Sequence, residues 1–181
     1  MYKTQMEAAR KGIITKEMEA VAAKEYRTPE EIRELVAKGQ VAICANRLHK
    51  SIEPNGVGSM LRTKINVNLG VSRDCNDYDI EMKKVMAAVN MGAEAIMDLS
   101  SHGNTQPFRQ KLVAECPAMI GTVPVYDSVI HYQRDLATLT AKDFIDVVRL
   151  HAEDGVDEIY TLLDEMIKAE EQFEKKWKEY L

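Results

Sequence analysis

Short apolar runs alternate with longer amphipathic segments through the middle of the chain. Segments between the runs carry apolar residues at helical spacing, as residues 78–91 do before Gly92. Strands that alternate with helices usually pair in parallel, so we expect four parallel strands in sequence order with helices on the outer face. The four runs with the length and composition of strands are 41–45, 64–69, 93–99 and 119–125.

Three short helices are predicted before the first strand. Thr4 and Thr15 can cap helices over about 5–11 and 16–25. Thr28 opens a third helix, with proline in the first turn and Glu31 placed to close a capping box. We therefore interpret residues 1–40 as an N-terminal helical segment and residues 41–157 as the α/β unit that follows it.

Further helices are expected at 107–116 and, opened by a capping box at Thr140, up to Gly155. The C-terminal segment, 158–181, has apolar residues at helical spacing and predicts one long amphipathic helix. Its start is also strand-like, so a fifth strand over 157–163 stays open. A long helix here would cover the inner face of the sheet, within one chain or across a homodimer. The apolar stripe comprises Ile159, Leu162, Met166, Phe173 and Trp177.

Composition and charge narrow the class of protein. The net charge is −5, which gives no general attraction to nucleic acid or to anionic membranes. No apolar run approaches the roughly 20 residues that span a bilayer, and residues 1–10 lack the apolar core of a signal peptide. Cys44, Cys75 and Cys116 are odd in number and far apart, unlike a disulfide framework or a compact metal site. We expect a cytoplasmic protein with unpaired thiols.

Polar or unusual side chains stand at the ends of three of the predicted strands, at a constant interval. Asn68, Met97 and Tyr126 are 29 residues apart. In a (β/α) barrel this period would place them at similar heights near the C-terminal mouth, where sites form. An amide, a thioether and a phenol suit a polar, planar small molecule. Spacing alone also permits simpler roles, in which Asn68 bonds loop amides, Met97 belongs to the core and Tyr126 is a half-buried aromatic residue.

Several motifs, in a fixed order, resemble the phosphomethylpyrimidine synthase family of thiamin pyrimidine synthesis. The resemblance covers about residues 4–157, without a break in the spacing between motifs. Related synthases that make hydroxybenzimidazole for the lower ligand of cobamides look similar too, and departures at 55–60 and 72–75 leave that branch open. The motifs are TQM at 4–6, ARKGIIT at 9–15, EME at 17–19, KINVNLG at 64–70, MDLS at 97–100 and GTVPVY at 121–126.

The resemblance implies the first four or five units of a (β/α)₈ barrel that rearranges aminoimidazole ribotide. The family is a carbon–carbon lyase of the radical S-adenosylmethionine class, with a [4Fe–4S] cluster and a divalent metal such as zinc. By the family pattern, Asn68, Met97 and Tyr126 match substrate-binding positions. The catalytic residues are not identified by the motifs in this chain.

The end of the chain departs from the family pattern. Leu162 stands where the family has a substrate-binding histidine. The later strands, the metal-binding histidines and the cysteine motif of the cluster have no counterpart. We therefore expect a truncated chain that holds no cofactor and is inactive alone. The alternative is a non-catalytic half-barrel remnant that serves as a scaffold or interaction module, either monomeric or homodimeric.

Overall fold

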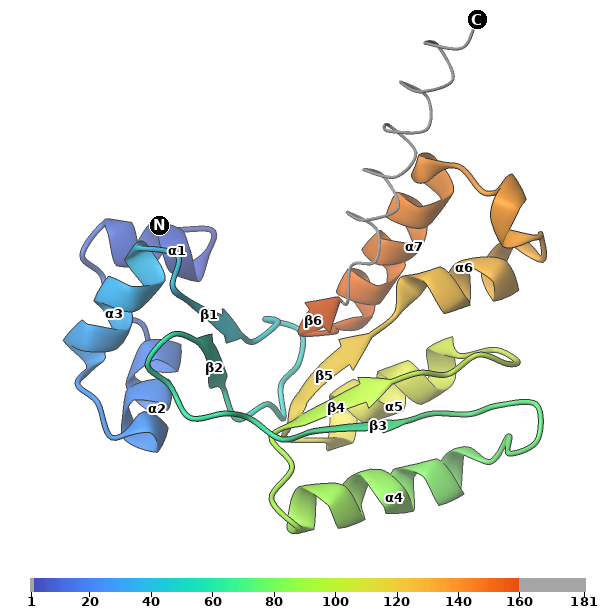
Figure 1. Ribbon diagram of the computed structural model, residues 1–181, viewed down its shortest axis with the longest axis horizontal. Helices are drawn as coiled ribbons and strands as arrows, with labels where there is room; N and C mark the ends of the chain where they lie inside the picture. Colours follow the sequence, from blue (N-terminus) through green and yellow to red (C-terminus); the bar gives the residue numbers. More distant parts are fainter. Residues whose placement is uncertain (1, 160–181) are drawn as a thin grey trace, which may run out of the picture.

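The computed structural model describes residues 2–159, which form two groups of elements (Figure 1). The first group begins with three helices, α1 (Gln5–Arg10), α2 (Lys16–Glu25) and α3 (Pro29–Ala37). The hydroxyls of Thr4, Thr15 and Thr28 each accept a backbone N–H of the first turn that follows. The capping box predicted at the third helix is confirmed.

The strand predicted at 41–45 exists, but its place in a parallel sheet was wrong. β1 (Val41–Cys44) pairs antiparallel with β2 (Asn55–Gly58), a strand that the sequence did not suggest, and the two form a separate sheet. The connection between them covers only residues 45–54, which is short for the crossover that parallel neighbours need. An antiparallel hairpin is the pairing that such a connection permits.

The second group contains a parallel sheet of four strands in the order β3-β4-β5-β6. Parallel pairing of the strands predicted at 64–69 and 93–99 is confirmed. The fourth strand of the sheet is β6, so the C-terminal segment begins as the strand alternative rather than as a helix. The other residues of the predicted C-terminal helix lie outside the described part of the chain. The strands are β3 (Asn66–Leu69), β4 (Ala95–Asp98), β5 (Met119–Thr122) and β6 (Glu158–Ile159).

Three helices of this group were predicted and are confirmed: α4 (Tyr78–Asn90), α5 (Gln106–Glu115) and α7 (Ala141–Asp154). A fourth, α6 (Pro124–Tyr132), replaces the expected end of the strand at 119–125 and is followed by a 3₁₀ turn, Leu136–Thr138. Proline in the first helical turn is the signal that would have predicted α6. Of the described helices, none is long and apolar enough to cross a membrane.

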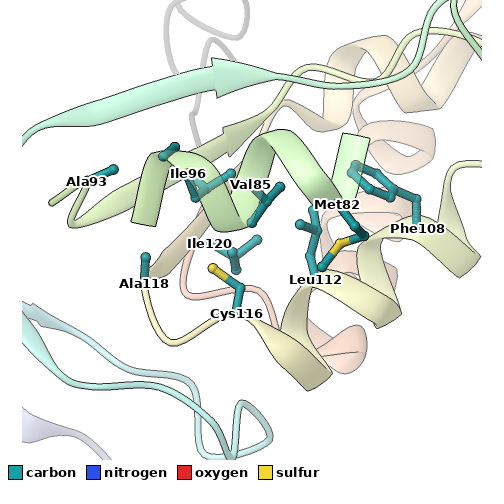
Figure 2. Close-up of a cluster of buried hydrophobic side chains, with 10 residues drawn as sticks. Met82, Val85, Ala93, Ile96, Phe108, Leu112, Cys116, Ala118 and Ile120 are labelled. Carbon is teal, nitrogen blue, oxygen red and sulfur yellow. The ribbon is translucent and has the colours of Figure 1, made fainter. Parts of the chain in front are cut away.

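The core of the second group lies between one face of the sheet and the helices α4 and α5 (Figure 2). Ile96 and Ile120 project from the central strands toward this core and are fully buried. Phe108 and Leu112 of α5 and Val85 of α4 fill the space opposite them. Because side chains alternate along a strand, the residues between these project from the opposite face of the sheet, which we call the inner face.

A smaller core joins the three N-terminal helices to the first hairpin. Val41 of β1 is buried there with Val21 of α2 and Ile32 and Val36 of α3. A third cluster, in which Cys44 and Ile52 pack on Ala95 and Met119, joins the hairpin region to the inner face of the parallel sheet. The division of the chain into units at 1–40, 41–157 and 158–181 stays a prediction.

Candidate functional site

A row of four residues crosses the inner face of the parallel sheet. Asn68 of β3 is the register partner of Met97 of β4, and Met97 is the partner of Gly121 of β5. Gly121 in turn is aligned with Glu158 of β6. Residues aligned in this way project to the same side of a parallel sheet. Two of the three predicted site residues, Asn68 and Met97, are thus brought together.

Met97 extends along this row because Gly121 has no side chain. A Cβ placed on Gly121 would lie 2.8 Å from Cε and 3.0 Å from Sδ of Met97, and 3.6 Å from Cβ of Glu158. The thioether therefore occupies the space above β5 and reaches toward β6. The row presents an apolar, polarizable surface between an amide at one end and a carboxylate at the other.

Asn68 is exposed, and its orientation is fixed by a neighbour on the same strand. Nδ2 of Asn66 donates to Oδ1 of Asn68 at 2.8 Å. This leaves the amide nitrogen of Asn68 directed to other partners, since one of its oxygen lone pairs is already used. An exposed amide can bond to the edge of a small heterocycle, while the thioether beside it packs on the face of the ring.

Tyr126 does not lie in this row, contrary to the expected equal heights. β5 ends at Thr122, and Tyr126 lies in the first turn of α6 with 44% of its surface exposed. The constant interval of 29 residues predicted a wrong position for Tyr126, because helix α6 begins at Pro124. Gly121 is the residue of β5 that the row contains.

A buried polar network fixes α6 against the sheet and against its neighbouring helices. The two ring nitrogens of His151 lie 2.8 Å from Oγ1 of Thr122 and 2.9 Å from Oδ2 of Asp127. Nη1 of Arg109 donates to the same carboxylate at 3.2 Å, and Thr105 donates its hydroxyl to the other oxygen. The sequence did not single out Arg109 or Asp127, because no fixed spacing marks such a network.

Two aspartates at this end of the sheet have shifted pKa values. Burial alone would raise the pKa of Asp127, but hydrogen bonds with His151 and Thr105 and the Arg109 guanidinium outweigh it and hold the pKa at about 2. Burial raises the pKa of Asp98, although the hydroxyl and backbone N–H of Ser100 both donate to its carboxylate. The Asp127 carboxylate joins α6 to α5 and α7 through Arg109 and His151, and the Asp98 carboxylate holds the loop after β4 through Ser100.

A cavity of about 540 Å³ lies beside this network, at the C-terminal end of β4. It is lined by polar side chains of the loop before α5 and of α6, among them His102, Asn104, Asp127 and His131. Loops at the carboxyl ends of parallel strands are the usual places for ligands in α/β proteins. The cavity lies next to α6, the helix that carries Tyr126.

The three cysteines do not form a cluster site. Cys116 lies in the core beside Leu112, and Cys44 donates its thiol to Glu158 at 3.2 Å. Burial raises the pKa of both thiols, which opposes the thiolate form that iron requires. Within residues 2–159 no three His, Cys, Asp or Glu side chains are grouped to hold a metal ion. The described residues do not fit a [4Fe–4S] cluster or zinc.

Comparison with known proteins gives concordant matches. The model of the Radical SAM ThiC family matches residues 4–172, beyond the Asp157 at which the resemblance was expected to end. The phosphomethylpyrimidine synthase of Alkaliphilus oremlandii is 62% identical over 156 residues, which are 86% of this chain and 36% of that protein. The enzymes of the same name from Clostridioides difficile and Clostridium botulinum (strain Hall) are 58% and 55% identical over the same length.

The chain therefore spans about a third of the length of the curated relatives it matches. The synthase names of these relatives do not favour the alternative of a non-catalytic half-barrel remnant that serves as a scaffold or interaction module. With a family match over most of its length and relatives above 50% identity, the chain belongs to the Radical SAM ThiC family.

Proposed function

We propose that this chain supplies a substrate-binding face of a phosphomethylpyrimidine synthase, the enzyme that forms the thiamin pyrimidine phosphate from aminoimidazole ribotide. The sheet β3–β6 would be the first part of a (β/α) barrel, with its inner face toward the substrate. The observation that carries the proposal is the pairing of Asn68 with Met97 on that face, at two positions that match the family's substrate-binding pattern.

Each residue has a distinct task in this proposal. The Asn68 amide donates to an acceptor atom of the substrate, since Asn66 already donates to its oxygen. Met97 packs its thioether on the planar imidazole. Tyr126, in the first turn of α6, offers a partly exposed hydroxyl from the end of β5. These three side chains bind and orient the substrate.

The radical chemistry of the family is supplied by S-adenosylmethionine and an iron–sulfur cluster. The described residues contain no site that fits the cluster, so we assign to them no step of that chemistry. Eight relatives at 54–62% identity carry the name phosphomethylpyrimidine synthase, which supports the thiamin branch over hydroxybenzimidazole synthesis.

Titration calorimetry with aminoimidazole ribotide tests the proposal. Replacing Asn68 with Ala and Tyr126 with Phe together should weaken binding at least about tenfold, because each change removes a hydrogen bond to the ligand. The matched control replaces Asn90 with Ala and Tyr26 with Phe, two exposed residues of the same types. The control should bind like the unchanged protein.

Equal binding by both double variants would overturn the assignment of Asn68 and Tyr126. Circular dichroism of each variant, recorded before titration, separates a lost contact from a lost fold. Absence of binding by the unchanged chain would contradict the proposal for this chain directly.

A further inference from the structure

Glu158 occupies the fourth position of the row on the inner face. It is aligned with Gly121, and its Cβ lies 3.6 Å from the point where a Cβ on Gly121 would be. Met97 reaches toward the same point. The carboxylate of β6 therefore stands at the end of the surface that begins with Asn68.

The carboxylate of Glu158 is only partly satisfied by the protein. The Cys44 thiol donates to Oε1 at 3.2 Å, and within residues 2–159 Oε2 has no hydrogen-bond partner. A carboxylate has room for about four donors, so one weak thiol donor leaves most of this capacity open. The side chain is half-buried, which makes an open acceptor more costly than one in water.

Glu158 also lines a cavity of about 320 Å³ on the inner side of the sheet. Ala95 and Met119 line the same cavity from β4 and β5, and Asn66 from β3. Lys64 and Arg62 line it as well, but both cations have other partners. The Lys64 ammonium donates to Glu25 and to the Arg62 carbonyl, and the Arg62 guanidinium pairs with Glu25 and Glu94. The cavity thus has apolar and polar walls, and its one carboxylate forms no ion pair with a cation of residues 2–159.

The volume and the lining restrict the ligand to a small class. A cavity near 300 Å³ is at the lower limit for organic ligands and suits a single small ring. The open acceptor in this cavity is the Glu158 carboxylate, so a ring bound against it must carry N–H groups. An amino-substituted imidazole meets both conditions.

We propose that Glu158 is a further binding residue, whose carboxylate accepts N–H donors from the amino-substituted ring of the substrate. This inference rests on the proposed function and adds to it the part of the ligand that β6 recognises. Cys44 is a positioning residue, because its thiol holds one carboxylate oxygen and leaves the other directed to the ligand. Nothing in the family motifs that identify Asn68, Met97 and Tyr126 includes Glu158.

Methyl-labelled methionine provides a local probe, because Met97 lies beside Glu158. The full chain is titrated with aminoimidazole ribotide and, separately, with ribose 5-phosphate, which has no ring nitrogen. The Met97 resonance, assigned by its loss in Met97→Leu, should shift only with the ribotide. Calorimetry gives the affinity for each ligand. Replacing Glu158 with Gln should weaken binding of the ribotide at least about tenfold and leave binding of ribose 5-phosphate unchanged, because the charged acceptor is lost.

Glu153→Gln is the matched control, since Glu153 is an exposed acid of α7 and the change removes the same charge. It should bind both ligands like the unchanged chain. A circular dichroism spectrum of free Glu158→Gln that matches the unchanged chain verifies the fold. Glu158→Asp, which keeps the charge on a shorter side chain, should lose less affinity than Glu158→Gln.

Binding by Glu158→Gln equal to that of the unchanged chain, with Asn68→Ala weakened, would overturn the role of Glu158 and leave the proposed function standing. An equal loss for both ligands would also overturn it, because the ring would not be what Glu158 recognises. No effect of either substitution would overturn the proposed function and this inference with it.

Discussion

At the scale of single residues, glycines decide how closely the strand ends approach one another. Gly70 directly follows β3 and has a φ of +144°, and a Cβ there would lie 2.5 Å from the backbone nitrogen of Ser100. Its own N–H donates to Glu81 at 3.1 Å. The end of β3 can therefore lie beside the end of β4 only because this residue has no side chain.

Replacing Gly70 with Ala should destabilise the protein by about 2–4 kcal/mol, because backbone strain and a steric clash add. Gly92→Ala is the control, since Gly92 also has a positive φ of +97° but has no atom within 4 Å of an added Cβ. It should cost only about 1–2 kcal/mol, from strain alone. Urea denaturation measures the free energy of unfolding of both variants. Equal losses would show that the contact between the added Cβ and Ser100 contributes nothing.

At the scale of elements, helix boundaries could be predicted and strand partners could not. Thr28 with Glu31, and Thr140 with Asp143, form the capping boxes that the sequence indicates. These interactions are local, within one turn of helix, so the sequence contains all their partners. The pairing of β1 with β2 depends instead on residues outside the strand, and the glycine-rich stretch at 55–58 has little strand character.

In the candidate site, too, local features could be predicted and distant neighbours could not. Asn68 and Met97 were placed correctly because β3 and β4 are each continuous strands. Tyr126 was misplaced because Pro124 begins α6. Glu158 was not predicted at all, since the apolar spacing of the following residues favoured a helix. The spacing of apolar residues distinguishes a helix from a strand only where the helical period or the strand period fits the segment better than the other.

The helix α6 depends on Asp127, and this should be visible in the pH dependence of stability. The folded pKa of Asp127 is about 2, below the 3.8 of the free side chain. A lowered pKa stabilises the fold above the unfolded value, and the contribution is lost as the pH falls through about 4 toward 2. The loss should be about 2 kcal/mol.

Asp127→Asn removes that contribution at neutral pH and flattens the curve between about pH 4 and pH 2. Asp74→Asn, at an exposed loop position, serves as the control and should keep the slope of the unchanged protein. Urea denaturation at several pH values gives both curves. A variant curve as steep as the original would show that other carboxylates cause the acid sensitivity.

At the scale of the whole molecule, one buried pair joins the loop of the first hairpin to the parallel sheet. Nδ1 of His49 lies 2.6 Å from Oδ2 of Asp157, and both side chains are fully buried. The other ring nitrogen lies 2.7 Å from the Cys116 carbonyl. Asp157 also accepts the backbone N–H groups of Asn46 and Ile120, at 2.7 and 2.9 Å. The carboxylate thus connects residues from three distant parts of the chain.

Such a link lies beyond what the sequence could predict. His49 and Asp157 are separated by 108 positions, and neither belongs to a motif with fixed spacing. The interaction exists because the hairpin loop crosses the N-terminal edge of the sheet, where β5 and β6 begin. Only the assembled fold brings these two residues together.

Replacing Asp157 with Asn should therefore loosen the hairpin more than the sheet. The amide offers one acceptor oxygen in place of two, and its NH₂ group would face a backbone N–H or the His49 ring. We expect a loss of about 3–5 kcal/mol, the usual cost of breaking one partner of a buried pair. Hydrogen exchange should show faster opening of β1 and β2, while the amides of β4 keep most of their protection.

Replacing the other partner gives a matched test. His49→Gln should reproduce the effect of Asp157→Asn, whereas His131→Gln, at an exposed histidine, should not. If exchange accelerates equally in β2 and β4, the two sheets open as one cooperative unit and the pair is not a local link between them.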